Sequence, residues 1–544
     1  MTKEDINKQP FVTRTKALID ELKAVCASYG LGNDGNEFKI ISQIFLYKFL
    51  NDKFAYEIKQ LKPELANNDH WEAELANMKD SDYNMLQFQL GEATAFLKPH
   101  HLIGYLFERQ NEPDFAKLVD DTLIDIAVLN NDLFAVKTED GQKIQLFDRL
   151  TEYVSSKRDG FAVALLNKLV IFNFENIMGE GFDFFSTIFE YLIKDYNSDA
   201  GGKYAEYYTP HAVSKIIANI LVPEPTSNVT IYDPSAGSGT LLMNLAHAIG
   251  ADKCTVYSQD ISQKSSNLLR LNLVLNNLVH SIENVIQGNT MTDPYHKKDN
   301  KLRQFDYIVS NPPFKLDFSD DVDTLNKKEN KTRFFAGIPN VPKKAKDKMA
   351  IYTLFLQHII HSMRAGTGKA AIVVPTGFIT AQSGVDKKIR QKIVDGKMLA
   401  GVVSMPSNIF ATTGTNVSIV FMDAANKEDV VLIDASNLGT TVKEGKNQKT
   451  ELIDVEEDQI IDTFTKKEAK DDFSVVVSYE EIKAKNYSLS AGQYFEVKIE
   501  YIDITAEEFA SKMDSFESNL ETLFTESRDL ENEIQDNLKS LRYE

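Results

Sequence analysis

Beyond about residue 200, short apolar or β-branched runs alternate with helical patterns. Thr230-Ile231-Tyr232 precedes a helical pattern that begins at Leu241, and Thr255-Val256-Tyr257 precedes another over Ser262 to Asn277. Four further runs continue the series: Tyr307–Val309, Ala370–Val374, Leu399–Val403 and Val417–Phe421. Such alternation predicts βαβ units, and therefore an α/β fold whose largely parallel sheet carries helices on both faces. Ligands of such sheets bind at the carboxyl ends of the strands.

The N-terminal part of the chain contains few strand signals. Within Glu37–Phe49, four apolar residues recur at helical spacing and would share one face: Phe38, Ile41, Phe45 and Phe49. A second helical block runs from Phe182 to Tyr196. We therefore expect an all-helical domain over residues 1–180, followed by a catalytic domain over residues 181–500.

The C-terminal segment has a different pattern. Its apolar residues follow the 4-3 spacing of an amphipathic, coiled-coil-like helix, with Ser527 at one seam position: Phe509, Met513, Phe516, Leu520, Leu523, Leu530 and Ile534. Residues 505–544 carry 11 acidic and 4 basic side chains, so the outer face is acidic. We expect a helical tail over residues 501–544 that packs on its own domain or on another subunit.

Composition excludes several classes of protein. No apolar run approaches the roughly 20 residues of a membrane helix, and no apolar segment resembling a secretory signal follows the N-terminus. Cys26 and Cys254 lie far apart, which fits a reducing cytoplasm and leaves no thiolate zinc site. His358 and His361 have helical i, i+3 spacing, but no H-E-x-x-H occurs. We therefore expect a cytoplasmic protein without a metal site.

The net charge of −20 is unusual for a protein that binds nucleic acid, because phosphate neutralisation normally requires a basic face. Either the chain does not contact nucleic acid, or a partner supplies most of the contact. The segment from Lys297 to Lys348 differs from the rest, with 13 Lys/Arg and 8 Asp/Glu. A solvated loop would also explain this segment.

The first candidate site is the turn after the run Val229–Tyr232. Asp233 and Pro234 precede five small residues ending at Gly239, and a helix opens at Thr240. Glycines in such a turn let the backbone approach a ligand closely. The turn departs from G-x-G-x-x-G, and its acidic residue suits a cationic ligand better than a pyrophosphate. Asp260 follows the next strand, where an acid would hold ribose hydroxyls. These features favour a nucleotide-type cofactor over a structural turn.

The second candidate site is Asn311-Pro312-Pro313-Phe314, directly after the run Tyr307–Val309. An amino group on a purine ring is a poor nucleophile because its lone pair is delocalised. The Asn311 side-chain oxygen and the Pro312 carbonyl can accept its two hydrogens and so favour tetrahedral geometry. The prolines fix the turn and remove competing N–H donors, and Phe314 offers a face for an extruded base. This chemistry needs no metal.

Together the two motifs resemble those of the DNA amino-methyltransferases. Their order, with Asp-Pro-x-x-Gly-x-Gly before Asn-Pro-Pro-Phe, resembles the gamma class. From about Glu37 to Tyr494 the chain is similar to the modification subunits of type I restriction-modification systems. The resemblance implies a Rossmann-like fold and methyl transfer from S-adenosylmethionine to N6 of a flipped adenine in double-stranded DNA. It also implies a DNA specificity subunit shared by two modification subunits, and a restriction subunit.

The resemblance also implies roles for individual positions. The upstream cofactor-binding segment would be Glu206, Tyr207, Tyr208, Thr209, Pro210 and His211. The loop around the methionine part of the cofactor would comprise Asp233, Ser235, Ala236, Gly237, Ser238 and Gly239, and Asp260 would bind ribose, where the family often has Glu. The catalytic turn would be Asn311, Pro312, Pro313 and Phe314.

Two positions fit the family's motifs less closely. Phe410, in the looser motif Pro406–Phe410, would help to hold the flipped base. Asn289 stands where the family usually has an Asp that contacts the cofactor's adenine amino group. An amide oxygen can accept the same hydrogen bond without a charge, which predicts weaker cofactor binding.

Other functions remain open at this stage. N5-glutamine protein methyltransferases also use Asn-Pro-Pro, usually with Tyr and on shorter chains, and N4-cytosine enzymes usually have Ser in place of the Asn. An NAD-dependent oxidoreductase would explain the fold but leave Asn-Pro-Pro-Phe without a role. Asn289 keeps open a non-catalytic scaffold with a degenerate methyltransferase fold. No segment resembles a DNA target-recognition domain.

Overall fold

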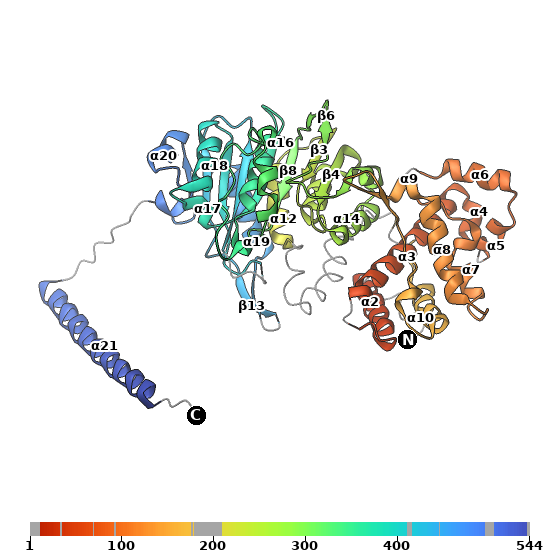
Figure 1. Cartoon of the computed structure of the whole chain (residues 1–544), viewed down its shortest axis with the longest axis horizontal. Coiled ribbons are helices and arrows are strands. Elements are labelled where there is room, and N and C mark those ends of the chain that lie inside the picture. Colours follow the sequence, from red (N-terminus) through yellow and green to blue (C-terminus); the bar gives the residue numbers. More distant parts are fainter. Residues whose placement is uncertain are drawn as a thin grey trace. The chain divides into compact units, whose positions relative to one another are not determined.

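The computed structural model of the chain describes residues 11–32, 35–68, 70–91, 94–175, 178, 209–410, 416–444, 447–495 and 505–540. The chain divides into two compact units, Met1–Tyr494 and Phe495–Glu544. The first unit contains a helical N-terminal region and one large sheet, and the second contains the C-terminal helix (Figure 1).

Helices dominate the N-terminal region. They are α2 (Phe11–Ser28), α3 (Gly35–Leu61), α4 (Pro63–Ala66), α5 (Trp71–Ala76), α6 (Asp80–Gln89), α7 (Ile103–Glu108), α8 (Phe115–Leu129), α9 (Asn131–Phe134) and α10 (Arg158–Val170). The predicted apolar face lies on α3, where Phe38, Ile41, Phe45 and Phe49 are all buried. The helical block predicted over Phe182 to Tyr196 lies outside the described residues.

The large sheet has the strand order β15-β12-β10-β11-β9-β8-β3-β4-β5-β1-β2. Its strands other than β1 and β2 are β3 (Val229–Asp233), β4 (Cys254–Asp260), β5 (Val285–Gln287), β8 (Tyr307–Ser310), β9 (Lys369–Pro375), β10 (Leu399–Ser404), β11 (Val417–Asp423), β12 (Val430–Asp434) and β15 (Ser474–Val477). All six strand runs expected from the sequence lie on these strands, while β5, β12 and β15 were not expected.

Most of the sheet is parallel, as predicted. Among its strands, β11, β15 and β2 run opposite to the rest. The chain passes from β3 outward through β4 to β5 and then returns to place β8 on the other side of β3. The strand order therefore reverses between β3 and β8, and a ligand site is expected at their carboxyl ends.

The helices of this part of the chain bury apolar faces against the sheet or against one another. They are α12 (His211–Leu221), α13 (Thr240–Ile249), α14 (Gln263–Leu275), α16 (Tyr352–Ser362), α17 (Gly377–Thr380), α18 (Gly384–Asp395), α19 (Asp454–Thr465) and α20 (Tyr479–Ala484). Helix α14 begins as predicted at Ser262, whose side chain accepts a hydrogen bond from the Ser265 amide.

Two hairpins and one insertion extend from the large sheet and its helices. The hairpins are β6 (Lys297–Lys298) with β7 (Lys301–Leu302), and β13 (Thr440–Glu444) with β14 (Asn447–Glu451). The insertion runs from Lys315 to Ile351, between β8 and α16, and contains α15 (Val322–Leu325).

The N-terminal region also contributes two strands to the large sheet, although the sequence predicted helices alone. Strand β1 (Val136–Thr138) pairs in parallel with β5, and β2 (Lys143–Ile144) forms the edge. These strands are too short to show a period-2 pattern, so sequence periodicity could not reveal them. The helical region and the catalytic sheet are therefore joined through backbone pairing.

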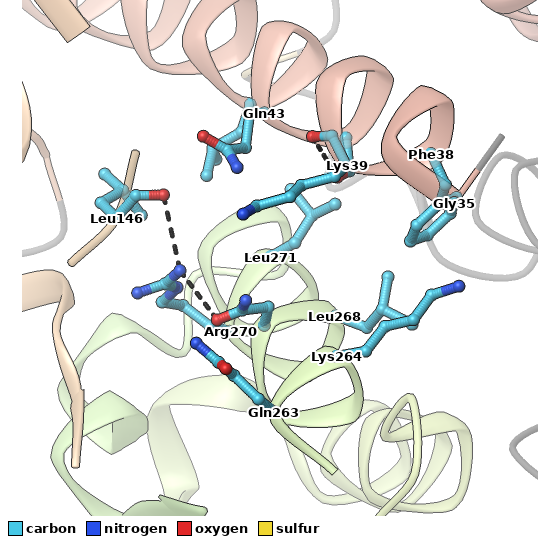
Figure 2. A pocket seen from close by; sticks show the side chains of 13 residues that line it. Gly35, Phe38, Lys39, Gln43, Leu146, Gln263, Lys264, Leu268, Arg270 and Leu271 are labelled. Atoms are coloured by element: carbon cyan, nitrogen blue, oxygen red, sulfur yellow. Dashed lines mark hydrogen bonds between the residues drawn. The ribbon is translucent and has the colours of Figure 1, made fainter. Parts of the chain in front are cut away.

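Side chains reinforce this junction. Arg270 on α14 is buried and donates to the carbonyls of Phe134, Ile144 and Gln145 at 3.3, 3.0 and 3.0 Å. A pocket of about 230 Å³ adjoins Arg270. Residues of α3 and α14 line it, together with Leu146 (Figure 2). At its edge the Lys264 ammonium lies 4.4 Å from the centre of the Phe38 ring.

The second unit is the helix α21 (Ala506–Ser540). Its predicted apolar seam is exposed: the exposed fraction of the side chains ranges from 50% at Met513 to 59% at Phe516, Leu523 and Leu530. None of the described helices combines the length and the apolarity that a membrane span requires.

Candidate active site

A small pocket lies at the carboxyl ends of β3 and β8, where the strand order reverses. The residues lining it come from three of the predicted segments: Thr209, Asp233, Ser235, Ala236, Gly237, Ser238, Thr240, Leu241 and Asn311. The fold thus brings the described part of the upstream segment, the small-residue turn and the catalytic turn together. Glu206, Tyr207 and Tyr208 lie outside the described residues.

Asp233 ends β3 and is only 2% exposed. One carboxylate oxygen accepts a hydrogen bond from the Ser235 amide at 2.9 Å. Burial raises the pKa of Asp233 to about 8; the Ser235 amide opposes the rise and the nearby Asp260 charge adds to it. A cationic group in the pocket would favour the deprotonated, charged form of this buried carboxyl.

The small-residue turn is held by hydrogen bonds from both neighbouring strands. Asp260, at the end of β4, accepts from the amides of Gly237 at 2.9 Å and Ser262 at 2.8 Å. The hydroxyls of Ser235 and Ser310 lie 2.6 Å apart and connect the turn to the end of β8. These contacts fix the backbone against which a cofactor would lie.

Gly239 has a left-handed backbone and lies close to α14. Its φ of +88° is left-handed, and a Cβ there would lie 2.3 Å from Leu269 Cδ1 on α14. Gly239 therefore allows α13 to start close to α14, and the close approach is to another helix. The sequence predicted a glycine needed by the cofactor and did not reveal this contact.

Asn311 follows β8 and projects its amide toward the upstream segment. Its Nδ2 donates to the Thr209 hydroxyl at 3.2 Å, and Thr209 is buried. Since the amide nitrogen is directed to Thr209, the side-chain oxygen is directed elsewhere and can accept a hydrogen from a substrate amino group. Pro210 precedes α12 and His211 is its first residue.

The rest of the catalytic turn is partly exposed. Pro312 is buried, whereas Pro313 and Phe314 are half-buried. The Phe314 ring meets Tyr352 edge-on, with centroids 6.4 Å apart. Tyr352 was not singled out by sequence reasoning, but its ring restricts the position of Phe314.

Phe410 lies on the loop after β10 and is only 8% exposed. The hairpin β13–β14 supports this loop through Thr450, whose hydroxyl donates to the Ser407 carbonyl at 2.6 Å. The Thr450 amide also donates to the Asn408 carbonyl at 3.0 Å. Because β10 and β12 run parallel to β8, this loop and the hairpin that follows β12 emerge at the same edge of the sheet as Asn311.

Asn289 lies two residues beyond β5, beside Asp260. Its side-chain oxygen accepts from the Met291 backbone amide at 3.0 Å, and the backbone N–H of Asn289 donates to Glu139 Oε2 at 2.9 Å. Glu139 follows β1, so the N-terminal region contacts the cofactor side of the sheet. Glu139 was not among the site residues predicted from the sequence.

One group of side chains with metal-ligand chemistry is found in the described residues, and it lies in the N-terminal region: His100, His101 and Asp125. Both ring nitrogens of His101 are already engaged. Nδ1 accepts from the Lys98 amide at 3.1 Å, and Nε2 lies 2.7 Å from Asp125. This hydrogen bonding explains the cluster without a metal. In the pair His358 and His361, the Nε2 atom of His358 lies 3.1 Å from the Tyr232 hydroxyl.

Comparison with known proteins identifies the family. The Type I restriction enzyme MpnII methylase subunit of Mycoplasma pneumoniae is 26% identical over 532 residues, which cover 92% of this chain and 93% of that protein. The MjaIX methylase subunit of Methanocaldococcus jannaschii is 26% identical over 529 residues, covering 93% and 88%. The crystal structure of a type I restriction-modification methyltransferase subunit from Streptococcus thermophilus has the same fold. It has a TM-score of 0.72 and 22% identity, and covers 90% of this chain and 100% of that one.

Residues 180–501 match the family described as N-6 DNA Methylase. The match confirms the predicted α/β fold, adenine-specific DNA methylation and S-adenosylmethionine as methyl donor, and it supports DNA over protein as the substrate. The buried acid, the small-residue turn and Asp260 suit the cationic, ribose-containing donor. With more than half of its length matched, the chain belongs to the N-6 DNA methylase family.

Proposed function

We propose that this chain is the modification subunit of a type I restriction-modification complex, and that Asn311–Phe314 holds the adenine that it methylates. The Asn311–Thr209 hydrogen bond carries the catalytic part of the proposal, because it orients the amide beside the cofactor pocket. The subunit assignment is supported by the names of the relatives, which are methylase subunits of type I restriction enzymes.

In the proposed mechanism the target base leaves the duplex and stacks on Phe314. The Asn311 oxygen and the Pro312 carbonyl accept the two hydrogens of the adenine amino group and make its lone pair available. When bound, S-adenosylmethionine would supply the electrophilic methyl group and leave as the neutral thioether, while the amino group loses one proton to solvent. Because Pro313 has no N–H, it cannot compete for these acceptors. Phe410 would contact the base from the loop after β10.

The same proposal assigns the cofactor contacts. Asp233 and the turn Ser235–Gly239 would surround the methionine part, and Glu206–His211 would be a further cofactor-binding segment. Asp260 would bind the ribose hydroxyls, and Asn289 the adenine amino group. Since the Asn289 oxygen already accepts from the Met291 amide, only its second lone pair remains for the cofactor.

Partners follow from the proposed subunit role. We infer that two copies of this chain assemble with one DNA specificity subunit, and that a restriction subunit joins them in the cytoplasm. The net charge of −20 supports a division of labour in which the isolated chain binds DNA only weakly at physiological salt. The exposed seam of α21 offers an apolar surface for such a partner.

Methylation by defined variants tests the proposal. The chain is co-expressed with the specificity subunit of its operon, and methylated bases are mapped by sequencing. Asn311→Ala is expected to lower methylation by at least about 100-fold, since it removes an interaction with the reacting group, and to leave the Kd for S-adenosylmethionine within about threefold. Asp233→Ala is expected to weaken cofactor binding itself.

Asn111→Ala is the matched control, because it removes an exposed amide in the N-terminal helical region, outside every proposed binding surface. Methylation at a near wild-type rate by Asn311→Ala would show that the catalytic assignment is wrong. An unmethylated genome with the wild-type chain and its partner would contradict the enzyme role itself and favour the scaffold alternative.

A further inference from the structure

The insertion from Lys315 to Ile351 carries a dense group of exposed lysines. Between residues 327 and 348 there are seven of them, which we call the lysine patch: Lys327, Lys328, Lys331, Lys343, Lys344, Lys346 and Lys348. The same stretch contains only two acidic residues, Glu329 and Asp347. In a chain of net charge −20, this is a strong local excess of positive charge.

The insertion is anchored to the rest of the first unit. It has its own small core, which includes Phe318, Leu325, Phe334 and Met349. The Gln357 side chain on α16 accepts from the Ala336 amide at 2.7 Å. The lysine patch therefore lies on a packed element, so its position relative to the active site is defined.

Two contacts hold the insertion beside the active site. The Leu316 amide, two residues beyond Phe314, donates to the Met349 carbonyl at 3.1 Å, which brings Lys348 close to the catalytic turn. On the cofactor side the buried Arg333 donates to the Thr290 carbonyl at 3.2 Å. Thr290 in turn donates through its hydroxyl to the Pro234 carbonyl at 2.7 Å.

The patch is not neutralised within the described residues. None of its seven lysines forms an ion pair with a described carboxylate; Lys346 donates to the Ser319 hydroxyl at 3.0 Å, and its charge adds to the Ser319 hydrogen bonds that lower the pKa of the nearby Asp317. Exposed like charges at this density repel one another, which lowers stability unless a polyanion binds. Arg333 is buried and donates to backbone carbonyls, so its role in the insertion is structural. The lysines around it are exposed and are therefore available to a ligand.

We propose that the lysine patch binds the phosphate backbone of the DNA duplex next to the flipped adenine. The inference rests on the proposed function, because a base that reaches Asn311 must bring its flanking phosphates to the same edge of the sheet. Lysines bind phosphate without reading sequence, so this contact adds affinity and orientation whichever site the specificity subunit selects. An acidic chain thereby contributes its own DNA contact where the chemistry occurs.

The test uses the complex with the specificity subunit and a triple variant, Lys328→Gln, Lys343→Gln and Lys344→Gln. The Kd for duplex DNA is measured by fluorescence anisotropy over a series of KCl concentrations. We expect the slope of log Kd against log [KCl] to fall by about 1 to 3, since each phosphate contact contributes roughly 0.9. At about 0.15 M salt the Kd should rise roughly tenfold, for specific and non-specific duplexes alike.

The matched control is Lys397→Gln, Lys427→Gln and Lys467→Gln, which also removes three positive charges. Lys397 precedes β10 and Lys427 follows the antiparallel β11, so both lie at the amino ends of the parallel strands. Lys467 lies 3.5 Å from Asn426 at that edge. The control should retain the wild-type slope, and both variants should retain the wild-type Kd for S-adenosylmethionine.

An unchanged slope in the patch variant overturns the inference, and so does an equal loss in the control, which would indicate net charge alone. These results leave the proposed function intact if the wild-type complex still methylates DNA. Absence of methylation by the wild-type complex would instead contradict the proposed function.

Discussion

Asp233 combines burial with a position in the cofactor pocket. With a pKa of about 8, it carries a proton at neutral pH in the cofactor-free protein. A cationic sulfonium favours the carboxylate, so binding of S-adenosylmethionine should release this proton. The same raised pKa means that the folded protein holds the proton more tightly than the unfolded chain. Asp233 therefore lowers the stability of the cofactor-free protein as pH rises from about 4 to about 8.

The affinity for S-adenosylmethionine is thus expected to rise with pH below 8. The expected gain is up to about tenfold per unit between pH 6 and 8, with a plateau above the pKa. Calorimetry in buffers of different ionisation enthalpy measures both the Kd and the protons released. Asp233→Asn should bind more weakly and lose this pH dependence. The same slope in wild type and variant would assign the titration to another group.

The chemistry of single site residues could be predicted from the sequence better than the contacts that those residues make. Asp233, Asp260 and Asn311 were selected because their types suit a cationic cofactor and an amino substrate, and the fold brings them to one edge. Their partners could not be predicted, since Thr209 is 102 residues from Asn311 and the Ser235–Ser310 bond spans 75. Gly239 illustrates the limit further, because its constraint comes from Leu269 on another helix.

At the element scale, the β13–β14 hairpin supports the loop that carries Phe410. Asn408 in that loop has a left-handed φ of +57°, which costs energy for a residue with a side chain. The two hydrogen bonds from Thr450 stabilise the loop in this conformation. The hairpin is therefore expected to matter for base binding although it contributes no residue to the pocket.

Thr450→Val tests this role, because it keeps the shape of the side chain and removes its hydroxyl. We expect kcat to fall about three- to tenfold, as for loss of one buried hydrogen bond, with cofactor binding unchanged. Fluorescence of 2-aminopurine at the target position should show less base extrusion, and Thr450→Ser should restore it. Thr441→Val, at the paired but exposed position, is the control. Normal extrusion by Thr450→Val would contradict the supporting role.

Elements were predictable where strand and helix patterns alternate clearly in the sequence, although β5, β12 and β15 were missed. The six expected strands stand next to turns or to helices with clear periodicity. Apolar residues recur at helical spacing in α3 and α14. Strands β1 and β2 contain only three and two residues, so their pairing depends on a partner far along the chain. The expected border at residue 180 rested on local pattern, which carries no information about such pairing.

For the whole molecule, the second unit contains one long helix, α21, which carries the apolar seam. Its seam residues are each at least half exposed, and an isolated helix with so much apolar surface is marginal in water. Its acidic outer face disfavours pairing between two copies of the tail. These features favour a partner of different composition, such as the specificity subunit.

Deletion of residues 506–544 should leave a folded protein that binds S-adenosylmethionine and no longer assembles with the specificity subunit. Light scattering after gel filtration measures assembly, and thermal shift measures cofactor binding. Leu520→Asp with Leu523→Asp should reproduce the loss, whereas Ser518→Asp with Thr525→Asp adds the same charge away from the seam and should not. Aggregation or loss of cofactor binding after the deletion would show that the tail belongs to its own domain.

The β1–β5 pairing also sets the order in which the protein can mature on the ribosome. Lys137 pairs with Ile286, so the N-terminal region leaves the exit tunnel well before its partner strand is made. At typical rates of synthesis, the roughly 150 intervening residues take on the order of ten seconds. During that time β1 has β2 as its neighbouring strand and lacks β5. The junction between the helical region and the catalytic sheet can therefore be completed only after β5 has been synthesised.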